Sequence, residues 1–412
     1  KDPDNRVSLW DMSKVKDLYI SGFIGTDWAG VTHRVASLDQ AKKTVTSVNG
    51  TSYPATVDHR LYFWNLVEEI DMPGESYIDR DKKIIYFYPP ADTKNAEVTV
   101  ASSDKVMFNL VGCKNITLKG FTCDTSRNRF INISSGENVT VEDCILARGS
   151  SNAISVGGTN CTVKGCHIYE MGRGGISVSG GDRATLTPAS NVIENNRIHS
   201  FNRVYNSSVP GISITGVGQI IRNNAVYDAP HILIQLTNAP DTLLEYNEIY
   251  NGVLEASDIG AIYWGRTPQD FGLEIRYNYF HDIGNKYGGY GQQSVFYDDG
   301  TIGPYLHGNV FYRGTLTQDQ GGTPTGSFVI KTHGGQYGRI ENNIFIDSPV
   351  ALRVQPWDSA GSQGKQTRWW TWLQNTVNPV TTIISKPWLD HYKGTQWEAC
   401  QNVFSEASYN EL

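Results

Sequence analysis

A short unit of alternating polar and hydrophobic positions recurs along most of the chain. Each copy ends in Asn or Cys and is followed two residues later by a hydrophobic residue. The copies end at Cys144, Cys166, Asn196, Asn224, Asn247, Asn278, Asn309, Asn343 and Asn375. The hydrophobic residues that follow them are Leu146, Ile168, Ile198, Val226, Ile249, Phe280, Phe311, Phe345 and Val377. Because every second residue of a strand faces the same side, this alternation predicts short half-buried strands joined by a turn.

The spacing of the copies indicates a solenoid. Successive units lie 22 residues apart between Cys144 and Cys166 and 31 residues apart between Asn247 and Asn278. Stacked coils produce a constant unit with loops of variable length. Asn at one fixed turn position can hydrogen-bond to the Asn of the next coil, and Cys fits there as a small buried residue. We therefore predict an all-β fold, a right-handed parallel β-helix from residue 106 to about residue 385.

A second strand can be aligned in every coil, and it defines two outward columns. The outward column at its third position comprises Asn132, Ser155, Ser177, Ser213, Gln235, Tyr263, Phe296, Val329 and Arg353. Two residues further on, the column comprises Ser179, Thr215, Thr237, Gly265, Asp298, Lys331 and Gln355. Neighbouring coils lie about 4.8 Å apart, so this alignment places Asp298 beside Lys331 on an outward face.

The two ends of the chain do not follow the repeat. Residues 1–105 contain the alternating segments 34–38 (RVASL), 44–47 (TVTS) and 83–88 (KIIYFY), which predict a small antiparallel β-rich domain. Within it, residues 61–70 (LYFWNLVEEI) are the best candidate for a short helix. Residues 386–412 are expected to form a C-terminal cap or tail. The surrounding region is rich in tryptophan, at Trp369, Trp370, Trp372, Trp388 and Trp397, and either covers the open end of the solenoid or stacks on sugars.

Composition excludes several classes of function. The formal net charge of −7 disfavours nucleic acid, which requires a basic surface. No apolar run approaches membrane-spanning length, and the six cysteines contain no C-x-x-C pair, so we expect no membrane segment and no zinc site. Glycosylation sequons occur at Asn49, Asn115, Asn132, Asn138, Asn160 and Asn206. They favour a secreted, glycosylated protein, with the alternative that Asn and Thr are simply common in turns.

Seven short motifs indicate a family. They are residues 27–29 (DWA), 68–75 (EEIDMPGE), 86–90 (YFYPP), 229–231 (APH), 245–249 (EYNEI), 258–263 (DIGAIY) and 297–299 (YDD). With them the chain resembles the right-handed parallel β-helix carbohydrate-active proteins, over nearly its whole length. Within that group it is most similar to glycoside hydrolase family 141, which includes α-L-fucosidases and xylanases. The resemblance implies catalysis by two aspartates, and the matching positions are Asp258 and one of Asp298 or Asp299. It also implies that further coils precede the small β domain, as a missing N-terminal segment.

These carboxylates suit glycoside hydrolysis, which needs one carboxylic acid and a second carboxylate as nucleophile or base. Asp258, Asp298 and Asp299 lie outside the recurring unit. Adjacent carboxylates repel each other, which would raise the pKa of one of them. The alternative for the Asp-Asp-Gly sequence is a plain turn. Glu255 is a reserve candidate for this chemistry, and otherwise for substrate binding.

The candidate substrate-binding residues surround these carboxylates in the sequence. They are His231, Glu255, Tyr263, Arg266, Lys331 and His333. Tyr263 offers a stacking surface for a sugar ring, and His231 a hydrogen-bond partner for a hydroxyl. The alternative for Tyr263 and Arg266 is ordinary surface filling, for His231 it is the closing of a turn, and for Lys331 it is neutralisation of Asp298. We expect no metal and no cofactor, because the carboxylates at one point are too few for a calcium cage.

Three functions compete at this stage. The first is a secreted glycoside hydrolase acting on xylan, pectin, a fucosylated glycan or a similar polysaccharide. The second is a polysaccharide lyase, in which Lys331, Arg353 or Arg266 removes a proton next to a uronate carboxylate, often with calcium. The third is a non-catalytic β-helix that binds glycans through its aromatic columns. In each the partner is a polysaccharide or oligosaccharide.

Overall fold

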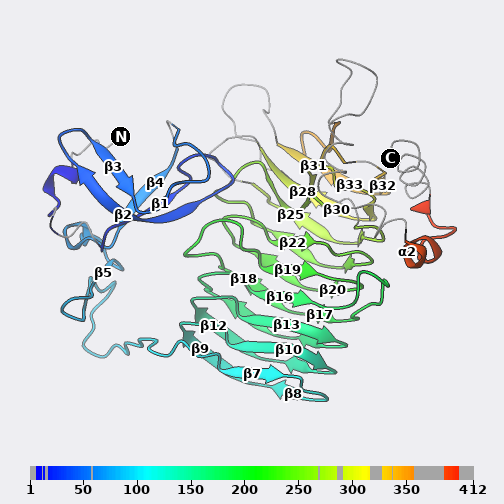
Figure 1. Cartoon of the computed structure of the whole chain (residues 1–412), viewed down its shortest axis with the longest axis horizontal. Coiled ribbons are helices and arrows are strands. Elements are labelled where there is room, and N and C mark those ends of the chain that lie inside the picture. The colour runs from blue at the N-terminus through cyan, green and yellow to red at the C-terminus, as the bar shows by residue number, and fades with distance from the viewer. Residues whose placement is uncertain are drawn as a thin grey trace. The chain divides into compact units, whose positions relative to one another are not determined.

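The computed structural model describes residues 6–11, 13, 17–56, 59–267, 270–284, 291–315, 327–335, 337–356 and 385–398. The chain divides into two compact units, Lys1–Val100 and Ala101–Leu412, close to the boundary at residue 105 expected from the sequence. Figure 1 shows the strands of each unit. Asn375 and the tryptophans at 369, 370 and 372 lie outside the described residues, and so does most of the predicted tail.

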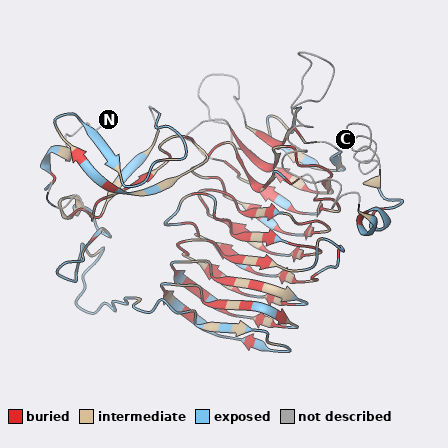
Figure 2. Ribbon diagram, in the orientation of Figure 1, coloured by how far each residue is buried: buried red, intermediate tan, exposed pale blue. Residues whose placement is uncertain are grey.

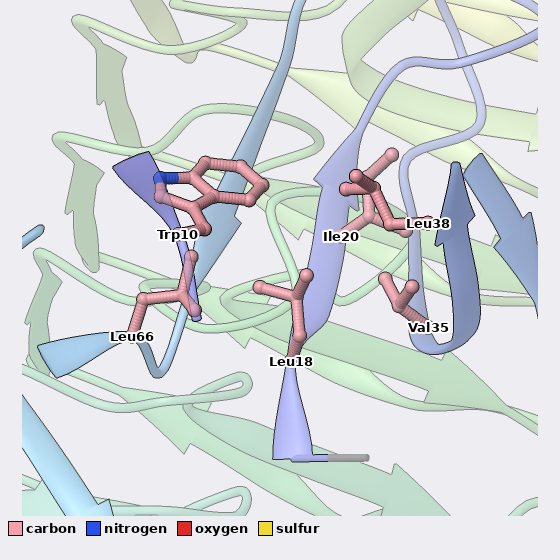
Figure 3. Close-up of a cluster of buried hydrophobic side chains, with 6 residues drawn as sticks. All are labelled: Trp10, Leu18, Ile20, Val35, Leu38 and Leu66. Atoms are coloured by element: carbon pink, nitrogen blue, oxygen red, sulfur yellow. The ribbon is translucent and has the colours of Figure 1, made fainter. Parts of the chain in front are cut away.

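The first unit contains a short 3₁₀ helix, η1 (Arg6–Leu9), and two antiparallel sheets. One sheet has the order β3-β2-β1-β4, with β1 at Tyr19–Gly22, β2 at Val31–Asp39, β3 at Thr44–Ser47 and β4 at Leu61–Trp64. The other pairs β5 (Ser76–Asp79) with β6 (Ile84–Phe87). A cluster of buried side chains holds the first sheet together, namely Trp10, Leu18, Ile20, Val35, Leu38 and Leu66 (Figure 3). The strands predicted at residues 34–38, 44–47 and 83–88 are therefore present.

The helix predicted at residues 61–70 is wrong. Strand β4 occupies its first part and pairs with β1, with Trp64 opposite Tyr19 and their rings stacked. Aromatic residues gain more from such cross-strand pairs than from a short isolated helix. The chain then turns at Asn65, which has a φ of 66°, before the single 3₁₀ turn η3 (Val67–Glu69). The Asn65 side chain donates to the Asp17 carbonyl and accepts from the Ile78 amide, which fixes this turn.

The second unit is a parallel β-helix built from three long sheets, as predicted from the sequence. Sheet 1 contains β7 (Phe108–Val111), β10 (Ile131–Glu137), β13 (Ile154–Thr159), β16 (Ile176–Ser179), β19 (Ile212–Thr215), β22 (Ile234–Thr237), β25 (Ile259–Gly265), β28 (Gln292–Asp298), β31 (Phe328–His333) and β34 (Leu352–Gln355). Sheet 2 contains β8 (Thr117–Lys119), β11 (Thr140–Glu142), β14 (Thr162–Lys164), β17 (Val192–Glu194), β20 (Ile220–Arg222), β23 (Leu243–Glu245), β26 (Glu274–Arg276), β29 (Tyr305–His307) and β32 (Arg339–Glu341). Sheet 3 contains β9 (Thr122–Ser126), β12 (Ile145–Gly149), β15 (His167–Tyr169), β18 (Arg197–His199), β21 (Ala225–Tyr227), β24 (Glu248–Tyr250), β27 (Tyr279–His281), β30 (Val310–Tyr312) and β33 (Ile344–Ile346).

The inward residues of the three sheets form a continuous core along the solenoid. In the three-residue strands from β14 to β30 the middle residue is buried and its neighbours are less so, apart from Tyr227 and Glu245 (Figure 2). The hydrophobic residues that follow the recurring unit, from Leu146 to Phe311, are all fully buried. The pattern read from the sequence thus identifies the core correctly.

The corner between sheets 2 and 3 carries the predicted ladder of asparagines. The Asn278 backbone amide donates to Asn309 Oδ1 at 3.0 Å, and the Asn247 amide donates to Asn278 Oδ1 at 2.9 Å. The same bond joins Asn224 to Asn247, Asn196 to Asn224, and Cys166 to Asn196. The residue before each ladder position is a Gly or has a φ near 55°, which turns the chain sharply into sheet 3. The stacking of successive coils at this corner is therefore confirmed.

The predicted register of β31 is wrong by two residues. Lys331 pairs with Phe296, not with Asp298, and Thr332 pairs with Tyr297. The next residue, His333, therefore lies beside Asp298, and Lys331 takes the place predicted for Val329 in the outward column. A shift of two residues keeps every side chain on its face, because the strand period is two. The sequence pattern alone could not detect this shift.

Helix α2 (Lys386–His391) packs on the loops that follow the strands of sheet 1. Trp388 is fully buried and donates from Nε1 to the Arg183 carbonyl at 2.8 Å. Tyr392 donates to Asp241 Oδ1 at 2.9 Å, and Trp397 Nε1 donates to the Gly303 carbonyl. These tryptophans of the tail therefore contact the flank of the solenoid over several coils. Among the described residues no helix is long and apolar enough to cross a membrane.

Candidate active site

The ends of β25, β28 and β31 bring three candidate residues together on the outward face of sheet 1. Asp298 is the last residue of β28, and its Oδ2 accepts a hydrogen bond from the Tyr263 hydroxyl at 3.0 Å. His333, the last residue of β31, has its Nδ1 2.7 Å from Asp298 Oδ1. The Asp299 amide donates to the same Oδ1 at 2.8 Å. Asp298 is thus held from three sides by neighbouring donors.

Asp299 is paired with Arg266. Its Oδ2 accepts a hydrogen bond from Arg266 Nε at 2.8 Å, and its Oδ1 lies 3.5 Å from His333 Nδ1. Asp299 and Arg266 both have positive φ, 44° and 61°, immediately after the ends of β28 and β25. The chain leaves both strands through a tight turn, and this turn directs the two side chains toward each other. His333 therefore contacts both carboxylates of the Asp-Asp pair.

The electrostatics of this cluster keep Tyr263 protonated. Burial raises the pKa of Tyr263, and the charge of Asp298 raises it further. Tyr263 is therefore a hydroxyl donor to Asp298 at neutral pH. The hydrogen bond to Asp299 raises the pKa of Arg266, which remains a cation. The Arg266 side chain is more exposed than that of its partner Asp299, at 71% against 19%.

Asp258 has its own partner, Lys331. Lys331 Nζ donates to Asp258 Oδ1 at 2.8 Å, a contact between residues 73 positions apart in the sequence. The same Nζ lies 4.3 Å from the centre of the Phe296 ring, and Phe296 packs edge-on against Tyr263 with ring centres 5.7 Å apart. Phe296 therefore connects the Asp258–Lys331 pair to the Asp298 cluster on one face.

His231 and Glu255, like Asp258, precede the strands of sheet 1. They lie in the loops that precede β22 and β25, whereas Asp298 lies at the end of β28. His231 is only 1% exposed, and its Nδ1 accepts a hydrogen bond from the Ser208 amide at 3.3 Å. Glu255 accepts a hydrogen bond from Asn206 Nδ2 at 3.4 Å, and its amide donates to the Pro230 carbonyl. These loops form a second polar cluster at the start of the strands.

One group of described residues has the geometry to hold a metal ion. A ligand atom from each of Asp298, Asp299 and His333 lies within 4.8 Å of the other two. Tyr263 and Arg266 already engage the two carboxylates. Calcium prefers six to eight oxygen ligands, so three protein ligands including a nitrogen suit it poorly. The donor set is closer to that of a transition metal.

Two residues gain importance only in the structure. Phe296 stands in the predicted outward column, where no local pattern distinguishes it from the other aromatic residue, Tyr263. Asn206 is recognisable in the sequence only as a sequon. Both act through contacts between coils, and such contacts depend on the exact register and on loop conformation.

Comparison with known proteins agrees with this architecture. The family model described as "Right handed beta helix region" matches residues 85–208 and 157–345. No curated protein matches the chain. A solved structure titled "Glycoside hydrolase" superimposes with a TM-score of 0.55 and 11% sequence identity, covering 87% of this chain and 72% of that one. At this identity the likeness shows a shared fold.

Proposed function

Since this chain belongs to the right-handed β-helix family, we propose that the outward face of sheet 1 carries a glycosidase site. The protein is then a secreted glycoside hydrolase of the family 141 type, acting on xylan, pectin, a fucosylated glycan or a similar polysaccharide. The observation that supports the proposal is that each of the two carboxylates has a basic partner, Lys331 for Asp258 and His333 for Asp298. The glycoside hydrolase title of the structural neighbour supports the same class.

The two carboxyl groups divide the reaction between them. One group donates a proton to the glycosidic oxygen as the bond to the leaving sugar breaks. The other either attacks the sugar carbon or takes a proton from the attacking water. Asp258 and Asp298 fill these roles, and Asp299 is the alternative to Asp298 because His333 contacts both.

The remaining candidates are assigned to binding. Arg266 is exposed and offers donors to sugar hydroxyls next to Asp299. Tyr263 and His333 shape the site around Asp298. At the other end of the strands, the half-buried Glu255 is the proposed contact for a more distant sugar, and the buried His231 anchors its loop.

The lyase remains the second candidate, favoured by the metal-ligand geometry of Asp298, Asp299 and His333. A lyase would need an unprotonated base next to a uronate. Lys331 is a poor choice for this role, because its ammonium group is buried and paired with Asp258. The hydrolase therefore agrees better with the contacts of the face.

A panel of xylan, pectin and fucosylated oligosaccharides tests the proposal. Release of reducing sugar without an unsaturated uronate product is the expected result. Replacing Asp258, or the catalytic member of the Asp298–Asp299 pair, by Asn should lower kcat by about 10²–10⁴-fold, because Asn keeps the shape but cannot transfer a proton. The melting temperature should stay close to that of the unmodified protein.

Asp143→Asn is a matched control, because Asp143 is an exposed corner residue on a distant coil with the same positive φ. It should leave the rate unchanged. An Asp258→Asn variant with normal activity would exclude Asp258 from catalysis. An unsaturated product would establish the lyase, and binding without turnover would indicate a glycan-binding protein.

A further inference from the structure

The side chain of Lys331 crosses the outward face of sheet 1 to reach Asp258. Lys331 belongs to β31, yet its partner precedes β25, two coils away in the sheet order. The residue is only 8% exposed, whereas 32% of the Asp258 side chain is open to solvent. The lysine is therefore enclosed, and the carboxylate at its tip is accessible.

Stability does not require this arrangement. The preceding residues of the same column are Ser213, Gln235, Tyr263 and Phe296, which pack without a charge. Removing an ammonium group from water is costly, and an ion pair commonly does no better than apolar residues of the same size. A shielded lysine with a single carboxylate at its tip is therefore better explained by a role in the chemistry.

Phe296 fixes the direction of the lysine. Lys331 is directly opposite Phe296 in the parallel register, and its Nζ lies 4.3 Å from the ring centre. A cation over an aromatic face is attracted to it, most strongly when both are shielded from water. Phe296 itself is 1% exposed and packs against Tyr263. The ammonium group consequently has little freedom to turn away from Asp258.

We propose that Lys331 is a positioning residue, which holds the Asp258 carboxylate in one orientation, so that Asp258 acts as the nucleophile or base. This inference rests on the proposed glycosidase function. With Oδ1 engaged by Lys331, the oxygen that meets the sugar or the water is Oδ2. The proton for the leaving oxygen then comes from the Asp298–Asp299–His333 group. Lys331 thus acts through Asp258 and does not bind the substrate.

The test compares Lys331→Met, Lys331→Arg and Phe296→Leu with the unmodified enzyme. Lys331→Met should lower kcat by about 10²-fold or more while KM changes little. Lys331→Arg should recover most of the lost kcat, and Phe296→Leu should lie between the two. Lys164→Met, on a distant coil, should match the unmodified enzyme.

Two outcomes would overturn the proposal. A rise in KM with unchanged kcat would make Lys331 a substrate contact. A fall in kcat that Lys331→Arg does not restore, matched by a loss of thermal stability, would make the lysine purely structural.

A second readout is independent of turnover. In protein with carboxyl-labelled aspartate, the NMR signal of Asp258, identified with the Asp258→Asn variant, should move in Lys331→Met because the carboxylate loses its lysine partner. If no glycan is cleaved, the glycosidase proposal fails, but this comparison still decides whether Lys331 holds Asp258. An unchanged Asp258 signal would reject the inference.

Discussion

The corner asparagines of the β-helix each make the same set of contacts, and Asn278 shows what one of them contributes. Its Nδ2 donates to Asn309 Oδ1 and to the carbonyls of Leu244 and Arg276. Its Oδ1 accepts from the backbone and side-chain nitrogens of Asn247. Because Asn278 is 1% exposed, water cannot replace these partners. The side chain therefore satisfies backbone groups of two coils and binds the asparagine side chain of a third.

Replacing Asn278 with Leu should therefore lower the free energy of unfolding by roughly 1–3 kcal/mol. The loss follows from the buried Leu244 carbonyl and Asn247 amide, which would remain without partners. Chemical denaturation of the purified variant measures it. Asn278→Cys is the matched control, because Cys166 occupies the equivalent position in an earlier coil, and it should cost less. Equal stability of Asn278→Leu and the unmodified protein would contradict this role.

The glycosylation sequons also have an explanation at the level of single residues. Asn115, Asn138 and Asn160 all have a φ of about 54° and lie two residues before the first strand residue of sheet 2 in three successive coils. Asn tolerates this left-handed conformation better than most residues, and Thr suits the strand that follows. The repeated Asn-x-Thr sequence is thus what the corner itself requires. Asn138 Nδ2 also donates to Asn115 Oδ1 at 3.1 Å.

At the scale of elements, α2 is joined to the solenoid by buried polar contacts as well as by tryptophan. Asp241 accepts a hydrogen bond from Tyr392 and lies 2.8 Å from His391. Asp270, in the loop after β25, is fully buried and accepts a hydrogen bond from the Ala239 amide. Burial raises the pKa of Asp241, and it raises the pKa of Asp270 to about 6. Both carboxylates therefore bind a proton more tightly in the folded chain than in the unfolded one.

This difference predicts that the protein loses stability as pH rises from about 4 to about 6. A carboxylate whose pKa is raised by folding stabilises the folded state below its unfolded pKa of 3.8, and the contribution disappears as pH passes the folded value. For Asp270 the difference corresponds to roughly 3 kcal/mol. Asp270→Asn should flatten the pH dependence of the unfolding free energy over this window. Asp390→Asn, an exposed change on α2, should not, and an unchanged slope in Asp270→Asn would contradict the prediction.

The elements that the sequence predicts well are those with a strict local pattern. The recurring unit predicts the strands of sheets 2 and 3 because their burial, their turn and their hydrogen bonds all depend on neighbouring residues. Residues 61–64 form a strand and not a helix because they pair with β1, about 40 positions away. The register of β31 differs from the expected one because a strand pattern with a period of two fits equally well after a shift of two residues.

The same difference between local patterns and contacts made by distant residues applies to the site. Alternation places Tyr263 and Asp298 on one face, and Arg266 and Asp299 follow at the strand ends, where the structure brings them together. The contact between Asp258 and Lys331 has no local signature, since it joins a loop to a strand 73 positions later. His231 and Glu255, selected for their chemistry, lie in the loops before β22 and β25, and Asp258 also directly precedes β25.

At the scale of the whole molecule, the site combines residues from successive coils, and its proposed chemistry needs no metal. We expect hydrolysis to continue unchanged after treatment with EDTA, because carboxylates alone can supply the acid and the nucleophile or base. The rate on the best substrate of the panel, before and after chelation, measures this. Loss of activity that calcium restores would favour the lyase. Restoration by manganese or zinc would assign an ion to Asp298, Asp299 and His333.

The asparagine ladder also gives the solenoid a direction. From Asn196 to Asn309 every side-chain amide donates to the asparagine of the coil that follows, and none donates to the preceding asparagine. Dipoles aligned head to tail polarise one another, so each hydrogen bond strengthens the next. The corner therefore forms one polarised chain of hydrogen bonds, with its carbonyl end at Asn196 and its amino end at Asn343. Substitution of an asparagine in the middle leaves two shorter chains, in which each hydrogen bond is weaker. Substitution at either end removes only the terminal hydrogen bond of the chain.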